Sequence, residues 1–266
     1  MGAAIGAALR AHGREVAWAS QGRSVDTAER AEQAGLADVG DVEELCRSCD
    51  VLFSVCPPHA AIDVARSAAG FEGIYVDANA VSPETSRAIG SVVNRFVDGG
   101  IVGSPPREAG TTRLYLAGAE APEVAELFSG TIVDTRVVSD QPGAASAVKI
   151  AYASWTKGSS ALLLAAHAFA QAEGVEEALL EEWKLSLPDL AERSAAASRS
   201  AHRKGWRWVG EMEEIAASYA TAGLPDGFHQ AAAEIYRRTS GEPDGETLEQ
   251  VLAAIRETRE APTTLS

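Results

Sequence analysis

Short apolar runs alternate with helical patterns over the first half of the chain. Runs rich in Val, Ile and Phe predict strands, and the amphipathic stretches between them predict helices. The predicted strands cover residues 15–19, 51–55, 74–77, 95–98, 113–116 and 131–138, and the predicted helices begin at Gly2 and Asp26. Strands and helices that alternate at this pitch are typical of a parallel α/β sheet with crossover helices.

The pattern changes after Pro142-Gly143. From there to about residue 260 the chain has helical periodicity and is rich in Ala, Leu and Glu. We expect helices over residues 144–173, 176–183, 187–200, 207–222 and 226–238, with breaks at Pro188, at Gly205 and at the turn before Asp226. The sequence therefore predicts two domains: an α/β domain over residues 1–142 and an all-helical domain over residues 143–266. The first of these helices is long enough to join domains or to pack against another subunit.

Charge and composition narrow the class of protein. A formal net charge of -15 disfavours nucleic acid and anionic membranes as partners, since both usually require a basic face. No apolar stretch is long enough for a transmembrane helix, and the N-terminus lacks the pattern of a signal peptide, so we expect a cytoplasmic protein. Cys46, Cys49, Cys56 and His59 have a spacing that invites a zinc interpretation. We expect no metal there, because the predicted strand 51–55 separates Cys49 from Cys56 by about 20 Å.

The first residues are similar to the end of a dinucleotide-binding fingerprint, G-x-G-x-x-G, and the helix that follows it. In a complete unit, a buried strand and two earlier glycines precede this point. We expect those residues to lie upstream of Met1, so that the sheet of this chain lacks its first strand. The amides at the helix start, including those of Gly2 and Ala3, are expected to face a phosphate.

Three further loops follow predicted strands, where the carboxyl ends of parallel strands line a crevice. The loop 20–24 contains Arg23 and no acidic residue, which favours the 2′-phosphate of NADP over the free ribose of NAD; the alternative is a solvated loop arginine. The other two loops follow strands 51–55 and 74–77. The predicted cofactor-binding residues are Gly2, Ala3, Ser20, Arg23, Ser24, Val55, Cys56, Pro57, Asn79 and Ala80.

The order of these motifs resembles the β-hydroxyacid dehydrogenase and 6-phosphogluconate dehydrogenase superfamily over most of the chain. The resemblance is carried by the segments 22–24, 56–57, 77–83, 98–104 and 143–153. It implies a Rossmann domain that binds NAD(P), followed by a helical domain, and it places the catalytic lysine of the family at Lys149. The helical half resembles a branch of the superfamily that has no known activity.

Two positions depart from the family pattern. The substrate-binding serine of the family corresponds to Val102, and the asparagine one turn after the lysine corresponds to Ala153. We therefore expect different anchors for the substrate. The predicted substrate-binding residues are Gly103, Ser104, Tyr152, Thr156, Trp208 and Met212. Lys149 lies near the start of an Ala-rich helix, where partial burial is expected to lower the pKa of its amine towards neutrality; the alternative is a surface lysine.

The sequence predicts an oxidoreductase that prefers NADP, with NAD also possible. It transfers a hydride between the nicotinamide and a small hydroxyacid-like substrate, with Lys149 as general acid and base. We expect a homodimer formed through the helical domain. Two alternatives remain open at this point: an imine or carbonyl reductase, and a dinucleotide-binding protein without catalysis.

Overall fold

The computed structural model describes residues 1–239 and 247–257 of the 266-residue chain. The chain divides into two compact units, Met1–Tyr152 and Ala153–Ser266. The strands found among the described residues all lie in the first unit, and the second unit is helical. This arrangement confirms the predicted fold class, an α/β domain followed by an all-α domain.

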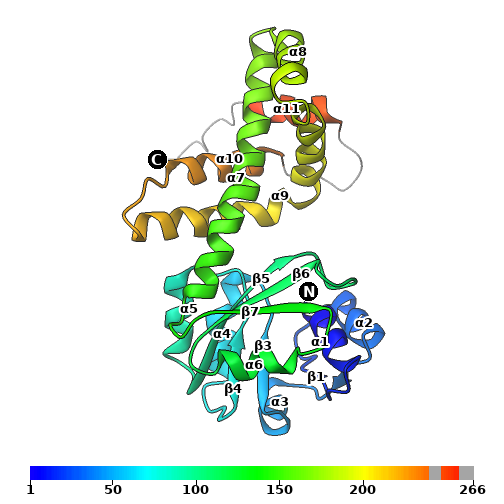
Figure 1. Cartoon of the computed structure of the whole chain (residues 1–266), viewed down its shortest axis with the longest axis vertical. Helices are drawn as coiled ribbons and strands as arrows, with labels where there is room; N and C mark the ends of the chain where they lie inside the picture. Colours follow the sequence, from blue (N-terminus) through cyan, green and yellow to red (C-terminus); the bar gives the residue numbers. More distant parts are fainter. Residues whose placement is uncertain (240–246, 258–266) are drawn as a thin grey trace, which may run out of the picture. The chain divides into compact units, whose positions relative to one another are not determined.

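Two sheets form the centre of the first unit (Figure 1). The larger sheet has the order β3 (Val51–Ser54), β4 (Ile74–Asp77), β5 (Arg95–Gly103), β6 (Thr112–Ala117) and β7 (Val133–Ser139). The smaller sheet pairs β1 (Ala17–Trp18) with β2 (Ala37–Asp38) in parallel. The prediction of a parallel sheet holds for every pair except β5 and β6, which are antiparallel. Only residues 104–111 connect these two strands, which is too short for a crossover.

The sequence pattern located β4 to the residue but underestimated β5. The predicted strand 95–98 continues through Gly99 and Gly100 to Gly103. Glycine has a low intrinsic propensity for β-strands. Here β5 is buried and hydrogen-bonded between β4 and β6, and this strand pairing outweighs the low propensity of its glycines. Strand β2 was not predicted, because Ala37 and Asp38 carry no apolar alternation.

Helices cover both faces of the larger sheet. On one face α1 (Gly2–Arg10) and α6 (Ala121–Leu127) pack with Ile74 and Val76 of β4; on the other, α4 (Ala61–Ser67) and α5 (Pro83–Gly90) pack with Tyr75. Successive residues of a strand point to opposite faces, so β4 contributes to both cores and is buried along its whole length. The remaining short elements are α2 (Val25–Gln33), α3 (Val42–Ser48) and the 3-10 helix η1 (Pro58–Ala60).

The helical part begins with α7 (Ala144–Ala172), which confirms the predicted long helix. It is followed by α8 (Glu176–Ser186), α9 (Leu190–Thr221), α10 (Gly227–Thr239) and α11 (Leu248–Arg256). The predicted break at Gly205 is wrong, since α9 is continuous through that residue. A glycine costs about 1 kcal/mol inside a helix, and the buried residues of α9 on both sides of Gly205 supply packing that offsets this cost. No helix among residues 1–239 and 247–257 combines the length and apolarity needed to span a membrane.

Candidate functional site

Two of the predicted cofactor loops are joined by a buried asparagine. The side chain of Asn79, which follows β4, is 2% exposed. Its Oδ1 accepts a hydrogen bond from the backbone N–H of Cys56 at 2.5 Å, and its Nδ2 donates to Ser54 Oγ at 3.0 Å and to Asp77. Asn79 thus fixes the loop after β3 against the end of β4. Its predicted role in cofactor binding stays a prediction, and its side chain is already engaged within the protein.

Asp77, the last residue of β4, is a buried carboxyl group. Burial raises its pKa to about 7; the hydrogen bonds from Asn79 act in the opposite direction, and the negative charge of Asp98 adds to the increase. Among the described residues, Oδ2 of Asp77 has no hydrogen-bond partner. An unpaired buried oxygen favours the protonated, neutral form, so this carboxyl group titrates close to neutral pH.

The raised pKa of Asp77 predicts a specific pH dependence of stability. The unfolded chain releases the Asp77 proton near pH 4 and the folded protein releases it near pH 7, so the free energy of unfolding falls as the pH rises between these values. The Asp77→Asn variant stays neutral and should lose this decline. Urea unfolding from about pH 3 to about pH 8, a range that brackets both pKa values, measures the difference. The exposed Asp63→Asn variant is the control, and parallel curves for Asp77→Asn and the parent protein would contradict the assignment.

Arg23 lies in the loop that follows β1 of the smaller sheet. It is exposed in the turn after β1, where its N–H donates to the carbonyl of Ser20 at 3.0 Å, and Ser24 forms the N-cap of α2. Burial raises the pKa of the Cys56 thiol, and the Arg23 guanidinium is among the groups that lower it. The loop after β1 and the loop after β3 are therefore within electrostatic reach of each other, as the prediction of a shared cofactor site requires.

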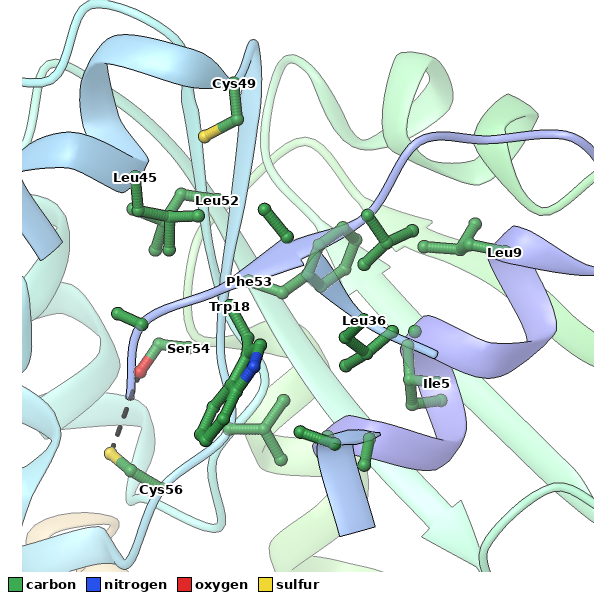
Figure 2. A pocket seen from close by; sticks show the side chains of 18 of the residues that line it. Ile5, Leu9, Trp18, Leu36, Leu45, Cys49, Leu52, Phe53, Ser54 and Cys56 are labelled. Carbon is green, nitrogen blue, oxygen red and sulfur yellow. Dashed lines mark hydrogen bonds between the residues drawn. The ribbon is translucent and has the colours of Figure 1, made fainter. Parts of the chain in front are cut away.

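A cavity of about 590 Å³ connects these loops with the space between β1 and β3. Figure 2 shows apolar side chains from α1, β1 and β3 in this cavity, among them Ile5, Leu9, Trp18 and Phe53. Six of the predicted cofactor-binding residues are part of its lining: Gly2, Ala3, Arg23, Val55, Cys56 and Pro57. These six lie at the carboxyl ends of the strands and at the start of α1, whose first backbone N–H groups have no partner within the helix.

Lys149 lies on the first turns of α7, and this part of the helix is fixed to β5 by Asp98. The carboxylate of Asp98 is completely buried. Its Oδ2 accepts hydrogen bonds from the N–H groups of Gly143, Ala145 and Ser146 at 2.9, 2.8 and 3.0 Å, and its Oδ1 accepts one from Ser146 Oγ at 2.6 Å. A carboxylate from the sheet thereby caps the helix and compensates its positive end.

The close approach of α7 to β5 requires a glycine at position 100. A Cβ atom built on Gly100 would lie 2.6 Å from the carbonyl oxygen of Ala145 and 3.2 Å from Cβ of Lys149. The backbone carbonyl cannot move away as a flexible side chain could. Lys149 is half-buried and is set directly against the middle of β5.

The predicted substrate loop starts later than expected, because residues 99–103 belong to β5. Val102 is 2% exposed and pairs with Arg113 of β6, so no polar side chain is available at this position. Gly103 has a φ of +112°, and a Cβ there would lie 2.0 Å from the carbonyl oxygen of Thr111. Gly103 and Ser104 are both exposed at the turn into residues 104–111. Tyr152 is 47% exposed near the end of the first unit.

Three predicted substrate residues belong to the second unit. Met212 is completely buried, and Trp208 packs edge-to-face on Tyr236 with ring centroids 5.1 Å apart. The hydroxyl of Tyr236 in turn donates to the carbonyl of Lys157 at 2.6 Å. Thr156 is half-buried on α7. Trp208 and Met212 thus take part in the core of the helical unit, and the substrate contacts of all three residues stay predictions.

The sequence interpretation did not find the capping role of Asp98. Asp98 was noted only as the start of a loop motif. One signal was present: a 29-residue helix that begins after Pro142-Gly143 has no capping side chain of its own, which points to a cap from elsewhere in the chain. Sequence alone does not indicate which acidic residue supplies it.

One family model matches part of the sequence, and individual relatives cover most of it. Residues 170–239 match a domain of unknown function, DUF1932. An uncharacterized 28.5 kDa protein of Methanothermus fervidus is 29% identical over 213 residues, which make up 77% of this chain and 83% of that protein. The conserved protein MTH1747, whose structure was described as similar to 3-hydroxyacid dehydrogenases, is 30% identical with a TM-score of 0.70, over 96% of this chain and 95% of that one.

More distant structures share the fold. 3-Hydroxyisobutyrate dehydrogenase of Mycobacterium tuberculosis, with L-serine, is 15% identical with a TM-score of 0.73, over 97% of this chain and 96% of that one. The reductive aminase of Aspergillus terreus, in complex with NADPH and ethyl-5-oxohexanoate, is 16% identical with a TM-score of 0.56, over 90% of this chain and 89% of that one. At these identities the likeness extends to the fold alone.

Proposed function

We propose, since this chain belongs to the β-hydroxyacid dehydrogenase superfamily, that it is an NADP-preferring oxidoreductase acting on a small hydroxyacid-like substrate. The observation that carries this proposal is the placement of Lys149. Lys149 is half-buried on the first turns of α7. This helix is capped by the buried Asp98 and packs closely on Gly100, so the lysine is held in a restricted position. Catalysis by proton transfer requires such restriction.

The residues at the carboxyl ends of the strands fit a dinucleotide. The start of α1 offers backbone N–H groups to a diphosphate, and Arg23 offers a planar cation to the 2′-phosphate. Asn79 keeps the Cys56-Pro57 loop in place beside them. When bound, NADPH supplies the hydride.

Lys149 is proposed to transfer the proton to and from the substrate. In the reducing direction its ammonium group donates a proton to the substrate oxygen, and in the oxidising direction its neutral amine takes the hydroxyl proton. Substrate anchoring within the first unit is assigned to Gly103, Ser104 and Tyr152. The predicted substrate contacts of Thr156, Trp208 and Met212, which belong to the second unit, carry no part of this assignment. Val102 and Ala153 supply no polar group, so the carboxylate of a hydroxyacid would have to bind elsewhere than in the family pattern.

Arg23 is expected to determine the preference for NADPH over NADH. Replacing Arg23 by alanine removes a charge-assisted contact to the 2′-phosphate, so the Kd of NADPH should rise roughly 10- to 100-fold and that of NADH by less than about threefold. Fluorescence titration with both cofactors measures this difference. The Arg66→Ala variant, which removes an exposed arginine on α4, is the control. An equal loss of affinity for NADPH and NADH would remove the argument for NADP.

The oxidoreductase activity is tested by following NADPH or NADP against a panel of small hydroxyacids, oxoacids and cyclic imines. Turnover of hydroxyacids supports the main proposal. Reduction of imines but not of oxoacids supports a second candidate, an imine reductase, which the apolar Val102 favours because it lacks the carboxylate-binding serine. Binding of NADPH without turnover of either class, with no effect of Lys149→Ala, would point to a dinucleotide-binding protein without catalysis.

We also propose a homodimer formed through the helical unit. Trp155, Leu162 and Phe169 recur every seven residues on α7 and are 71%, 55% and 66% exposed. A heptad stripe of large apolar residues is typical of a helix that packs against a partner helix, and α7 carries no acidic residue that would repel a second copy. Analytical ultracentrifugation should give a dimer for the parent protein and a monomer for Leu162→Glu. The exposed Leu185→Glu variant on α8 is the control and should stay dimeric.

A further inference from the structure

Basic residues are concentrated on one helix of this acidic chain. The formal net charge of the whole chain is -15, yet four of the nine residues from 199 to 207 are basic and none of the nine is acidic. This segment lies within α9, which is continuous through it. A local excess of positive charge on an acidic protein attracts an anionic partner to that place on its surface.

Three of these basic residues share one exposed face of α9 with a tryptophan. Arg203, Trp206 and Arg207 follow Arg199 by four, seven and eight residues, a spacing that places all four on the same face. All four are exposed, Trp206 to 68%. Nε of Arg203 donates to the carbonyl of Arg199 at 3.2 Å, and the guanidinium of Arg207 lies over the Trp206 ring, 5.8 Å from its centroid. We call these four residues the arginine stripe.

The arginines of the stripe have no carboxylate partner. Within residues 1–239 and 247–257, no acidic side chain lies at ion-pair distance from Arg199, Arg203 or Arg207. Elsewhere on the protein, arginines that do pair with carboxylates are Arg47, Arg66, Arg95, Arg136, Arg237 and Arg238. A guanidinium group can bind one carboxylate through two parallel hydrogen bonds. The stripe therefore offers three such groups to a partner, with no internal carboxylate to displace.

The stripe is short, and this limits the kind of anion that fits it. From Arg199 to Arg207 it extends about 12 Å, at about 1.5 Å per residue. Glu192, seven residues before Arg199, and Glu214, seven residues after Arg207, lie on the same face and end the positive charge on both sides. A long nucleic acid or a flat anionic membrane would extend across these glutamates and be repelled by them. A short acidic segment would not.

The spacing of the stripe defines the partner further. Its arginines recur every four residues, about 6 Å along the helix, and glutamates on successive turns of another helix recur at the same interval. Trp and Arg are also the residue types that most often dominate the binding energy of protein interfaces. We propose that the arginine stripe is a docking surface for a short acidic α-helix of a partner protein, with carboxylates on successive turns and an apolar side chain against Trp206. The inference does not depend on the oxidoreductase proposal.

The test is a titration of a fluorescein-labelled helical peptide with the full chain, followed by fluorescence anisotropy. The peptide is Ala-Ala-Gln-Glu-Leu-Ala-Gln-Glu-Ala-Gln-Leu-Glu-Ala-Gln-Ala, in which the glutamates lie four residues apart. Binding should be saturable, and it should weaken at least about fivefold when sodium chloride is raised from about 50 mM to about 200 mM. An isomeric peptide of the same composition, with the glutamates five residues apart and so spread around the helix, should bind at least about fivefold more weakly.

Variants of the protein locate the binding surface. Arg199→Gln/Arg203→Gln should lower the affinity for the first peptide at least about fivefold, because two charge-assisted contacts are lost. Arg47→Gln/Arg66→Gln makes the same change in net charge with exposed arginines of the first unit, and its affinity should stay within about twofold of the parent value. Arg199→Lys/Arg203→Lys keeps the charge but loses the planar fork and should bind with intermediate affinity. Circular dichroism checks that each variant keeps its helices.

Several outcomes would overturn the proposal. Equal affinity for the two isomeric peptides, or an equal loss in Arg47→Gln/Arg66→Gln, would mean that the binding is nonspecific. Tighter binding of a single-stranded oligothymidylate, or of vesicles that contain phosphatidylserine, would make nucleic acid or membrane the occupant. A shift from dimer to monomer in Arg199→Gln/Arg203→Gln, measured by analytical ultracentrifugation, would show that a second copy of the chain covers the stripe.

Discussion

Replacing Lys149 by methionine is expected to lower kcat by a factor of roughly 10² to 10⁴, with little change in the Kd of NADPH. Methionine keeps much of the length and apolar character of the lysine stem but can neither donate nor accept the proton. The half-buried position of Lys149 against β5 leaves room for a side chain of this size. Because the proton is transferred in the transition state, the loss should appear in kcat and not in cofactor binding.

The measurement is steady-state kinetics with the best substrate of the panel, together with NADPH titration. The Lys184→Met variant is the matched control, since Lys184 is an exposed lysine on α8 that pairs only with the neighbouring Glu181 among the described residues. The pH profile of kcat in Lys149→Met should also lack the limb that a titrating general acid and base produces. A kcat within about threefold of the parent value would exclude Lys149 as the general acid and base, whatever the fate of NADPH binding.

Replacing Asp98 by alanine should destabilise the first unit by about 3 kcal/mol or more. Three backbone N–H groups and one hydroxyl at the start of α7 would lose their acceptor while remaining buried, and each unsatisfied buried donor costs about 1–3 kcal/mol. Asp98→Asn keeps one acceptor oxygen but brings an amide N–H₂ towards the same donors, so its effect should be smaller and in the same direction.

The two units can unfold separately, so the readout must report on the first one. Hydrogen exchange of the buried β4 amides as a function of urea concentration meets this need. The Asp134→Ala variant on β7 is the control, because it removes a partly exposed aspartate whose partner is Arg136, and it should change stability by less than about 0.5 kcal/mol. A loss below about 1 kcal/mol for Asp98→Ala would show that water replaces the carboxylate and that the cap does not stabilise the helix.

The elements with strong local patterns were predictable from the sequence. β4 is a short apolar run that ends in Asp77, and α7 has uninterrupted helical periodicity until Gly174, so the local signal alone identified both. Gly205 shows the opposite case. A glycine is a local signal for a helix end, but the packing of residues distant in sequence keeps α9 intact. The extension of β5 through two glycines has the same origin, because pairing with β4 and β6 is not encoded in the strand itself.

The loops that form the candidate site were predictable from the sequence, but the hydrogen bonds that connect them were not. The loops at Cys56 and Asn79 were placed together because both follow parallel strands, and the structure brings them together. The hydrogen bonds that connect them could not be inferred, since Asn79 was as free to face a ligand as to face Ser54 and Asp77. The raised pKa of Asp77 depends on burial and on the nearby Asp98, which are properties of the assembled sheet.

The close contact between Gly100 and α7 also limits which substitutions this protein can accept during evolution. Any side chain at position 100 would clash with the backbone carbonyl of Ala145 and crowd Cβ of Lys149, so α7 would shift along or away from the sheet. A shift of even 1 Å in a proton-transferring group is costly for the reaction. Substitution at Gly100 is therefore tolerable only together with loss or relocation of the lysine. In descendants of this sequence the two positions should be retained or lost as a pair.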